Sequence, residues 1–337
     1  MSIQRLLKFL IENKEWLFSG VGLTIIALLL KESRSLIVRV NSSKILAKLG
    51  NFKVRTKRKK IIENGDIRII GSRACGKTTY LAALTDWHYA DMEKSIQLIE
   101  PKNEESRELV NLSKNILQQG LELEPTYMKK HSSLPIYNLI IQVLQRQYIY
   151  SMSLTLRDYA GEFFEDLAKR SVDSKINQYL NEIALSSKLL LMFEAEFSPN
   201  VRDSRYALAL RTLRQELLYR LKKGNRQIND YRIAIVFSKF DQLILKIDKL
   251  NQEEFARKRL IRTYNELQRW EEEWNCSIEY FFCSAFGLIH TIPEPNTIKL
   301  RDSGYVLKNP LKWKPFGLVE PILWLCTGQK NNKIMNF

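Results

Sequence analysis

Residues 66–83 read D-I-R-I-I-G-S-R-A-C-G-K-T-T-Y-L-A-A, and this stretch decides the fold. Its first five residues form a short apolar run typical of a buried strand, and the residues from Lys77 onward read as the start of a helix. Between them, residues 71–78 fit the pattern G-x-x-x-x-G-K-[ST]. Gly71 and Gly76 let backbone N–H groups wrap an anion, and the helix N-terminus adds positive potential. The stretch therefore predicts a phosphate-binding loop between a strand and a helix.

The side chains at the end of this loop predict a nucleoside triphosphate with a magnesium ion. We expect Lys77 to reach the β- and γ-phosphates and the Thr78 hydroxyl to ligate Mg²⁺. Thr79 follows in the first turn of the same predicted helix and is a further candidate for phosphate contact.

A second motif, D-Y-A-G-E at residues 158–162, follows an apolar run that reads as a strand. Asp158 at the strand end is expected to bind Mg²⁺, through water, and Gly161 to bring a backbone N–H close to the γ-phosphate. Glu162 then lies where a residue that positions the attacking water is needed. The alternative is an ordinary strand-end Asp followed by a turn glycine.

A third motif, S-K-F-D at residues 238–241, follows another apolar run. A carboxylate can accept hydrogen bonds from guanine N1–H and its exocyclic amine, whereas adenine has an acceptor at N1 and no amine at C2, so Asp241 is expected to select guanine. Ser238 and Lys239 belong to the same loop, and the aliphatic stem of Lys239 could cover the base. Ser284 and Ala285, after a further predicted strand, offer a backbone amide to the guanine carbonyl. The alternative for residues 238–241 is a helix cap.

Strands alternate with helices along the body of the chain, which predicts an α/β fold with a mostly parallel sheet and helices on both faces. We expect a hairpin from residues 136–144 and 149–157, helices over 162–186, 202–223 and 253–274, and strands over 188–195, 231–237 and 278–283. Residues 86–133 are a polar insertion with helical pieces such as 104–119. Residues 287–315 read as a loop before a closing helix at 316–326, so that 61–290 form the main domain and 291–337 complete it.

The first 30 residues contain an uncharged run, residues 16–30, which is slightly shorter than the roughly 17 apolar residues that a bilayer needs. Lys14 and Lys31 can snorkel, so a single membrane helix is favoured over two alternatives, a cleaved signal peptide and a buried core helix. No small-residue cleavage pattern follows Leu30. The fold is thus expected to be preceded by one N-terminal helix that anchors the chain in the cell membrane as a single-pass protein.

The net charge of +16 is concentrated behind this run, in residues 31–60. The positive-inside rule therefore places the catalytic domain in the cytoplasm, and the basic linker is expected to meet anionic lipid. The rest of the body is only mildly basic, so no nucleic-acid partner is expected. The cysteines lack metal-ligand spacing and read as reduced thiols: Cys75, Cys276, Cys283 and Cys326.

Four motifs in order, G-S-R-A-C-G-K-T, D-Y-A-G-E, S-K-F-D and C-S-A, resemble those of the Ras-like (TRAFAC) P-loop GTPases over about residues 65–290. The resemblance implies GTP and GDP as ligands, with Mg²⁺, and puts Glu162 where small GTPases have their catalytic glutamine. The G-K-T-T-Y-L-A-A-L start, D-Y-A-G-E and the closing E-P-I-L-W-L also look like the double-GTPase families of bacterial conflict systems. Since one such unit is present, a second GTPase unit would be another chain.

The sequence departs from this family pattern at several positions. Ser238 replaces the commoner Asn or Thr, and Phe286 replaces a common Lys, which both bear on guanine specificity. Arg73 stands where Ras-like switches usually have glycine, so it would crowd an arginine from a partner or supply the charge itself. The insertion should contain the first switch, for which Thr126 is the candidate ligand of Mg²⁺ and the γ-phosphate; an ordinary loop threonine is the alternative.

The sequence thus predicts a membrane-anchored GTP-binding switch that hydrolyses GTP slowly, with Lys77, Arg73 and Glu162 as catalytic residues and an unknown protein effector. Two other functions stay open. One is a P-loop ATPase in which residues 238–241 are only a cap. The other is a nucleotide-loaded scaffold that recruits a partner to the membrane without hydrolysis.

Overall fold

The structure is a computed structural model that describes residues 59–90, 96–119, 134–145, 148–170, 173–195, 199–225, 231–243, 251–289, 294–300 and 305–329. They lie in one compact unit, Arg58–Phe337. No helix within these ranges is long and apolar enough to cross a bilayer. The predicted anchor at residues 1–30 and almost all of the predicted linker lie outside the described residues, as does Thr126.

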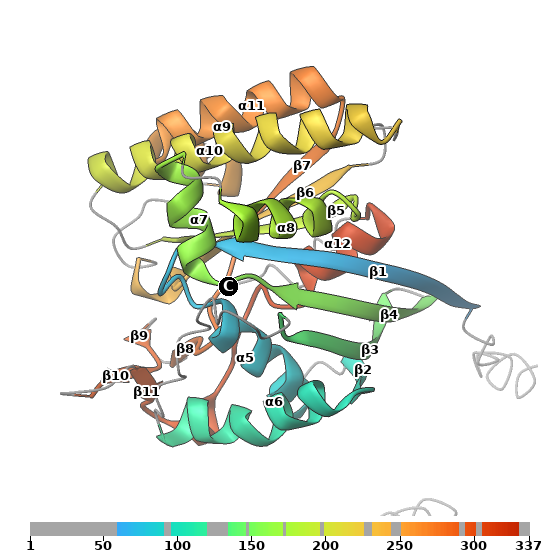
Figure 1. Cartoon of the computed structure of the whole chain (residues 1–337). Coiled ribbons are helices and arrows are strands. Elements are labelled where there is room, and N and C mark those ends of the chain that lie inside the picture. Colours follow the sequence, from blue (N-terminus) through green and yellow to red (C-terminus); the bar gives the residue numbers. More distant parts are fainter. Residues whose placement is uncertain are drawn as a thin grey trace, which may run out of the picture. The chain divides into compact units, whose positions relative to one another are not determined.

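A seven-stranded sheet in the order β2-β3-β4-β1-β5-β6-β7 forms the middle layer (Figure 1). The strands are β1 (Lys59–Gly71), β2 (Ile96–Pro101), β3 (Ile136–Gln145), β4 (Tyr148–Asp158), β5 (Lys188–Glu194), β6 (Arg232–Ser238) and β7 (Ser277–Phe282). Strands β4, β1, β5, β6 and β7 run parallel, and β3 is antiparallel to both β2 and β4. The predicted mostly parallel sheet and the predicted hairpin are confirmed.

Helices cover both faces of the sheet (Figure 1). One face carries α5 (Lys77–Ala90), α6 (Glu104–Lys114) with its π-helical extension η2 (Asn115–Gln119), and α12 (Glu320–Thr327). The other carries α7 (Gly161–Ala168), α8 (Ser174–Ile183), α9 (Pro199–Lys223), α10 (Gln252–Arg259) and α11 (Ile261–Trp274). Short elements complete the fold: the 3₁₀ turns η3 (Phe240–Gln242) and η4 (Pro310–Lys312), and the small strands β8 (Leu288–Ile289), β9 (Glu294–Pro295), β10 (Thr297–Lys299) and β11 (Tyr305–Leu307).

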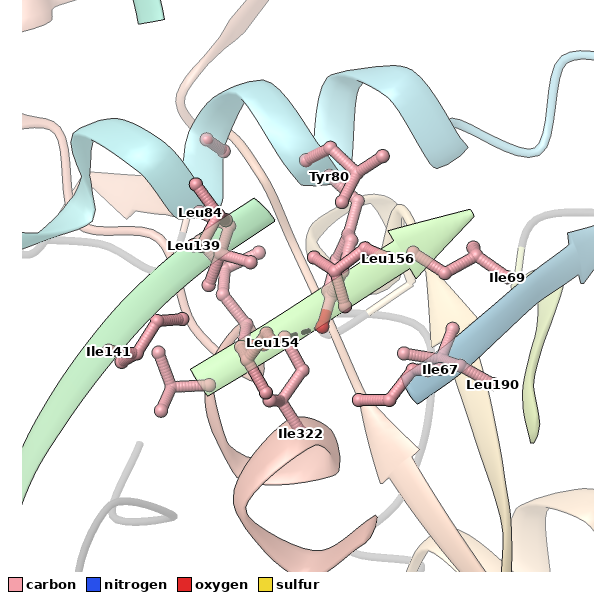
Figure 2. Close-up of a cluster of buried hydrophobic side chains, with 14 of the residues drawn as sticks. Ile67, Ile69, Tyr80, Leu84, Leu139, Ile141, Leu154, Leu156, Leu190 and Ile322 are labelled. Carbon is pink, nitrogen blue, oxygen red and sulfur yellow. Dashed lines mark hydrogen bonds between the residues drawn. The ribbon is translucent and has the colours of Figure 1, made fainter. Parts of the chain in front are cut away.

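The central strands are buried on both faces, which explains their continuous apolar sequences. In β5, Leu190 and Met192 pack under α5 and α12, while Leu189, Leu191 and Phe193 face the other helix layer. This alternation is the two-residue period of an extended strand. Figure 2 shows the first cluster, with side chains from α5, β3, β4, β1 and α12 meeting at one centre.

Two predicted helices are each divided. Residues 162–186 form α7 and α8, and the Asp173 side chain caps α8 by accepting from the N–H groups of Lys175 and Ile176. The predicted helix over 253–274 breaks at Leu260, which has φ −127° and ψ 54°. There the carboxylate of Asp203 on α9 accepts the freed N–H groups of Arg262 and Thr263. A side chain distant in sequence therefore decides where α11 begins.

Two segments contain strands that the sequence did not predict. The insertion at 86–133 includes the edge strand β2 as well as the helical residues expected at 104–119. The predicted loop at 287–315 contains the two small ladders β8–β9 and β10–β11, and the closing helix begins at Glu320 rather than Phe316. The four cysteines are buried and unpaired by disulfides, as expected of reduced thiols.

Candidate functional site

The predicted phosphate loop connects β1 to α5 at the carboxyl edge of the parallel strands, where α/β sheets bind ligands. Ala74 (φ 61°) and Gly76 (φ 88°) have left-handed backbones, which turn the chain sharply into the helix. Lys77 is 7% exposed, and its ammonium donates to the carbonyls of Gly71 (3.0 Å) and Ser72 (3.2 Å). The loop therefore curls around the lysine, with the open N-terminus of α5 at its end.

Asp158 ends β4 next to this loop, since β4 pairs in parallel register with β1. The Thr78 hydroxyl donates to Asp158 Oδ2 at 3.2 Å. Asp158 is fully buried, and burial raises the pKa of its carboxyl to about 6, against the lowering effects of Lys77 and Thr78. Within the described part of the chain, Asp158 Oδ1 has no hydrogen-bond partner. A buried carboxylate oxygen left over beside a hydroxyl fits a hard divalent cation such as Mg²⁺.

Gly161 opens α7 directly against the phosphate loop. A Cβ at this position would lie 2.4 Å from Arg73 Cα and 2.5 Å from Arg73 N, so only glycine allows the approach. The Arg73 side chain is exposed, and Glu162 is half-buried in the first turn of α7. The structure thus brings the D-Y-A-G-E motif and the phosphate loop into backbone contact.

The S-K-F-D loop is joined to the phosphate loop by a side chain. The Ser238 hydroxyl donates to the carbonyl of Cys75 at 2.6 Å, with the Phe193 carbonyl at 3.1 Å. Lys239 has a left-handed backbone (φ 56°), and its ammonium pairs with Glu194 at 2.7 Å. Asp241 lies in η3 and is 2% exposed. Ser238 therefore links the S-K-F-D loop to the phosphate loop.

The C-S-A loop lies beside the S-K-F-D loop. The Phe240 N–H donates to the Cys283 carbonyl at 3.1 Å, and the Phe240 and Phe282 rings stack with centroids 3.6 Å apart. Ser284 is fully buried; its N–H donates to the Phe316 carbonyl at 3.0 Å, and its hydroxyl accepts from the Gly287 N–H. The N–H and the hydroxyl oxygen of Ser284 are thus used inside the protein, which leaves Ala285 as the candidate for the predicted amide contact with a base.

Several residues around the site were not found by sequence reasoning. Glu194 ends β5 and pairs with both Lys239 and Arg202. Next to the phosphate loop, the Tyr206 hydroxyl lies 3.5 Å from the Ser72 hydroxyl. A strand-end position could have pointed to Glu194, because the carboxyl ends of parallel strands share an edge. Tyr206 lies inside a long helix and carries no comparable local signal.

Neither a protein-family model nor a curated protein matches the sequence. Among solved structures, the chain is similar to the G domain of the T. maritima FeoB iron transporter (12% identity, TM-score 0.25, 66% of this chain and 88% of that chain). It is also similar to the S. cerevisiae Ski7 GTPase-like domain bound to GTP (17%, 0.33, 73% and 45%) and to Sup35 complexed with GMPPNP (12%, 0.30, 72% and 42%). This chain spans less than half the length of the Ski7 and Sup35 chains.

The first of these neighbours is a G domain and the second a GTPase-like domain. Their identities and TM-scores are low, so we transfer no residue roles from them. The fold itself is an α/β fold with a mostly parallel seven-stranded sheet and a phosphate loop at its carboxyl edge.

Proposed function

We propose that this protein binds a guanine nucleotide with Mg²⁺ and hydrolyses GTP slowly. The proposal rests on one observation: Lys77, Thr78 and Asp158 lie together at one edge of the sheet. Lys77 donates into the loop, and Thr78 donates to Asp158. Thr78 and Asp158 would hold the cation, which neutralises phosphate charge when bound. Thr126, outside the described residues, is the proposed first-switch ligand. The Lys77 ammonium would neutralise the β- and γ-phosphates from inside the loop.

Guanine selection would rest on two groups from adjacent loops. The buried carboxylate of Asp241 accepts from the N1–H and amine of guanine, and adenine would leave this charge without its partners. The Ala285 N–H would donate to the guanine carbonyl. The contact between Phe240 and Cys283 supports this reading, because it holds the two loops side by side.

Hydrolysis would depend on Glu162 and Arg73. Gly161 lies against the backbone of Arg73, and Glu162 is the next residue after Gly161. This supports a position for Glu162 and Arg73 at the γ-phosphate end of the loop. Glu162 would orient the attacking water, and Arg73 would stabilise the charge of the transferred phosphoryl group. Because a glutamate accepts but does not donate when ionised, slow turnover is expected without an activating partner.

The cellular setting of this switch is also a proposal. The uncharged run at residues 16–30 and the basic residues after it support a single-pass anchor with the nucleotide site on the cytoplasmic side. The likeness of three motifs to double-GTPase families suggests that the effector is a second GTPase chain.

The test is competition against labelled GDP by unlabelled GDP, GTP, ADP and ATP, on the full chain with Mg²⁺. Competition by guanine nucleotides alone supports the proposal, whereas equal competition by ADP and ATP replaces it with an ATPase. Phosphate release from GTP is then compared between the parent and Glu162→Gln and Lys77→Ala variants. Release from the parent no faster than from Lys77→Ala would identify a scaffold that does not hydrolyse.

A further inference from the structure

The C-terminal segment at residues 313–318, here called the clasp, lies along the C-S-A loop. The Phe316 N–H donates to the Ser284 carbonyl at 3.1 Å and its carbonyl accepts the Ser284 N–H at 3.0 Å. The Trp313 indole N–H donates to the Ala285 carbonyl at 2.8 Å. Three hydrogen bonds thus hold two successive residues of the loop that is expected to read the base.

Two glycines let the clasp approach at backbone distance. A Cβ on Gly287 (φ 73°) would lie 1.8 Å from the Lys314 carbonyl oxygen. A Cβ on Gly317 (φ 67°) would lie 1.9 Å from the Phe282 carbonyl oxygen. Any other residue at either position would push the clasp away from the loop, so the contact depends on the absence of both side chains.

The clasp is itself held at both ends. The fully buried Asn296 receives the Asn309 N–H on its side-chain oxygen and donates its amide to the Asn309 carbonyl, just before η4. At the other end, the Tyr80 hydroxyl of α5 donates to the Leu318 carbonyl at 2.5 Å. The following turn and helix α12 are buried in the core cluster of Figure 2. The Leu318 end of the clasp is therefore fixed to the core by contacts that do not involve the loop.

Peptide geometry gives this contact a direction. The Ser284 carbonyl and the Ala285 N–H belong to one peptide unit, and the described chain contains no cis peptide bond. In a trans peptide the C=O and N–H point in opposite directions. Because Phe316 holds the Ser284 carbonyl, the Ala285 N–H points away from the clasp. Trp313 holds the next peptide unit through the Ala285 carbonyl, so both sides of Ala285 are fixed.

We propose that Trp313 is a specificity-determining positioning residue, which holds the Ala285 amide in the orientation that recognises the O6 carbonyl of guanine. This inference rests on the proposed guanine-nucleotide function. Trp313 does not touch the base; it acts through Ala285. Its loss should therefore weaken recognition of O6 and leave recognition of N1–H and the C2 amine by Asp241 unchanged.

The experiment measures the affinity of full-length parent and Trp313→Phe for three diphosphates. GDP presents O6, N1–H and the amine; 6-thio-GDP replaces O6 by sulfur, a weaker acceptor; IDP keeps O6 and lacks the amine. In Trp313→Phe we expect GDP and IDP to bind about three- to tenfold more weakly, the effect of one lost hydrogen bond. The preference for GDP over 6-thio-GDP should shrink, while the preference for GDP over IDP stays as in the parent.

Trp274→Phe is the matched control. Trp274 is buried on α11 and packs against Tyr231, at the amino end of β6 and away from the site. Trp274→Phe removes the same ring volume as Trp313→Phe, but at a position away from the C-S-A loop. It should keep the preference for GDP over 6-thio-GDP and the preference for GDP over IDP. Tyr80→Phe, which releases the other end of the clasp, should show the same pattern as Trp313→Phe to a smaller degree, and it serves as the test if Trp313→Phe does not fold.

An unchanged preference for GDP over 6-thio-GDP in both clasp variants would overturn the inference, as would equal weakening of all three diphosphates. Either result would leave the proposed function standing, provided that the parent prefers GDP to ADP. A parent without that preference would overturn the proposed function, and the inference with it.

Discussion

The phosphate side and the base side of the site are held in place by different kinds of structure. On the phosphate side, the loop and Asp158 end two neighbouring parallel strands whose register runs from Lys59 to Ile69. On the base side, residues 238–241, 284–285 and 313–318 are three loops joined by a few individual hydrogen bonds. A sheet register is set by many bonds at once, whereas each of these loop contacts depends on one to three. Substitutions should therefore have large effects on the phosphate side and graded effects on the base side.

The largest effect is expected from Lys77→Ala, which tests the phosphate side. Its ammonium lies inside the loop, and charge-assisted hydrogen bonds are each worth about 1.5–3 kcal/mol. Loss of its contacts with the β- and γ-phosphates should weaken GTP binding by about a hundredfold or more, measured by titration with a fluorescent, non-hydrolysable GTP analogue. Lys188→Ala is the control, because Lys188 also donates to a carbonyl, that of Asn64, outside the motifs. Binding within tenfold of the parent would show that the loop does not hold the phosphates.

The second largest effect is expected from Asp241→Asn on the base side. The amide can donate to the C2 carbonyl of xanthine but repels the amine of guanine, so GDP should bind about 10- to 100-fold more weakly while xanthosine diphosphate binds more tightly. Competition between the two diphosphates measures the change. Asp173→Asn is the control, since Asn caps α8 as well as Asp does. If the variant prefers GDP to xanthosine diphosphate as strongly as the parent does, Asp241 acts as a cap for η3 and does not recognise the base.

The third prediction concerns pH and the cation. Burial raises the pKa of Asp158 to about 6, so the ligand-free fold holds a proton there at a pH where the unfolded chain, with its lower pKa, does not. The free energy of unfolding should accordingly fall as pH rises from about 4 to 6. Cation binding needs the carboxylate, so the gain in GDP affinity from Mg²⁺ should increase through about pH 6 and level off above it.

Asp158→Asn provides the comparison for this pH step. Binding isotherms with and without Mg²⁺, at several pH values, should show neither the cation effect nor the step in this variant. A step of the same size in parent and variant would assign it to another group. This comparison shows whether the pH dependence of Mg²⁺-assisted binding comes from Asp158 or from another group on the phosphate side.

The phosphate side was readable from the sequence because its physics is local. A strand, a glycine-rich turn and a helix start adjoin in residues 66–83, and Asp158 is marked by its own strand end. The same applies to the buried strands, whose apolar runs gave β5, β6 and β7 within one or two residues. Thr78 and Asp158, which were both predicted to bind Mg²⁺, lie within hydrogen-bond distance of each other.

The base side was only partly readable because its order comes from contacts between distant segments. Ser284 and Ala285 were predicted to offer a backbone amide to the base, and the Ser284 N–H donates instead to the carbonyl of Phe316 in the distant C-terminal segment. The break at Leu260 depends on Asp203 of another helix, and the segment at 287–315 takes its order from buried Asn296 and short ladders. Propensity and periodicity report on local structure, so none of these tertiary contacts leaves a local signal.

The smallest effect is expected from Ser238→Ala, which tests the bond between the two sides. The Ser238 hydroxyl donates to the Cys75 carbonyl at 2.6 Å, and a neutral hydrogen bond of this kind contributes about 1 kcal/mol. Because the Ser238 hydroxyl is bonded to the carbonyls of Cys75 and Phe193, we expect its loss to change the spacing of the loops, so that GDP, IDP and 6-thio-GDP all bind about two- to fivefold more weakly. Ser238→Thr keeps the hydroxyl and should restore parent affinity. A loss confined to one diphosphate would mean that Ser238 contacts the base itself, and that the two sides are joined elsewhere.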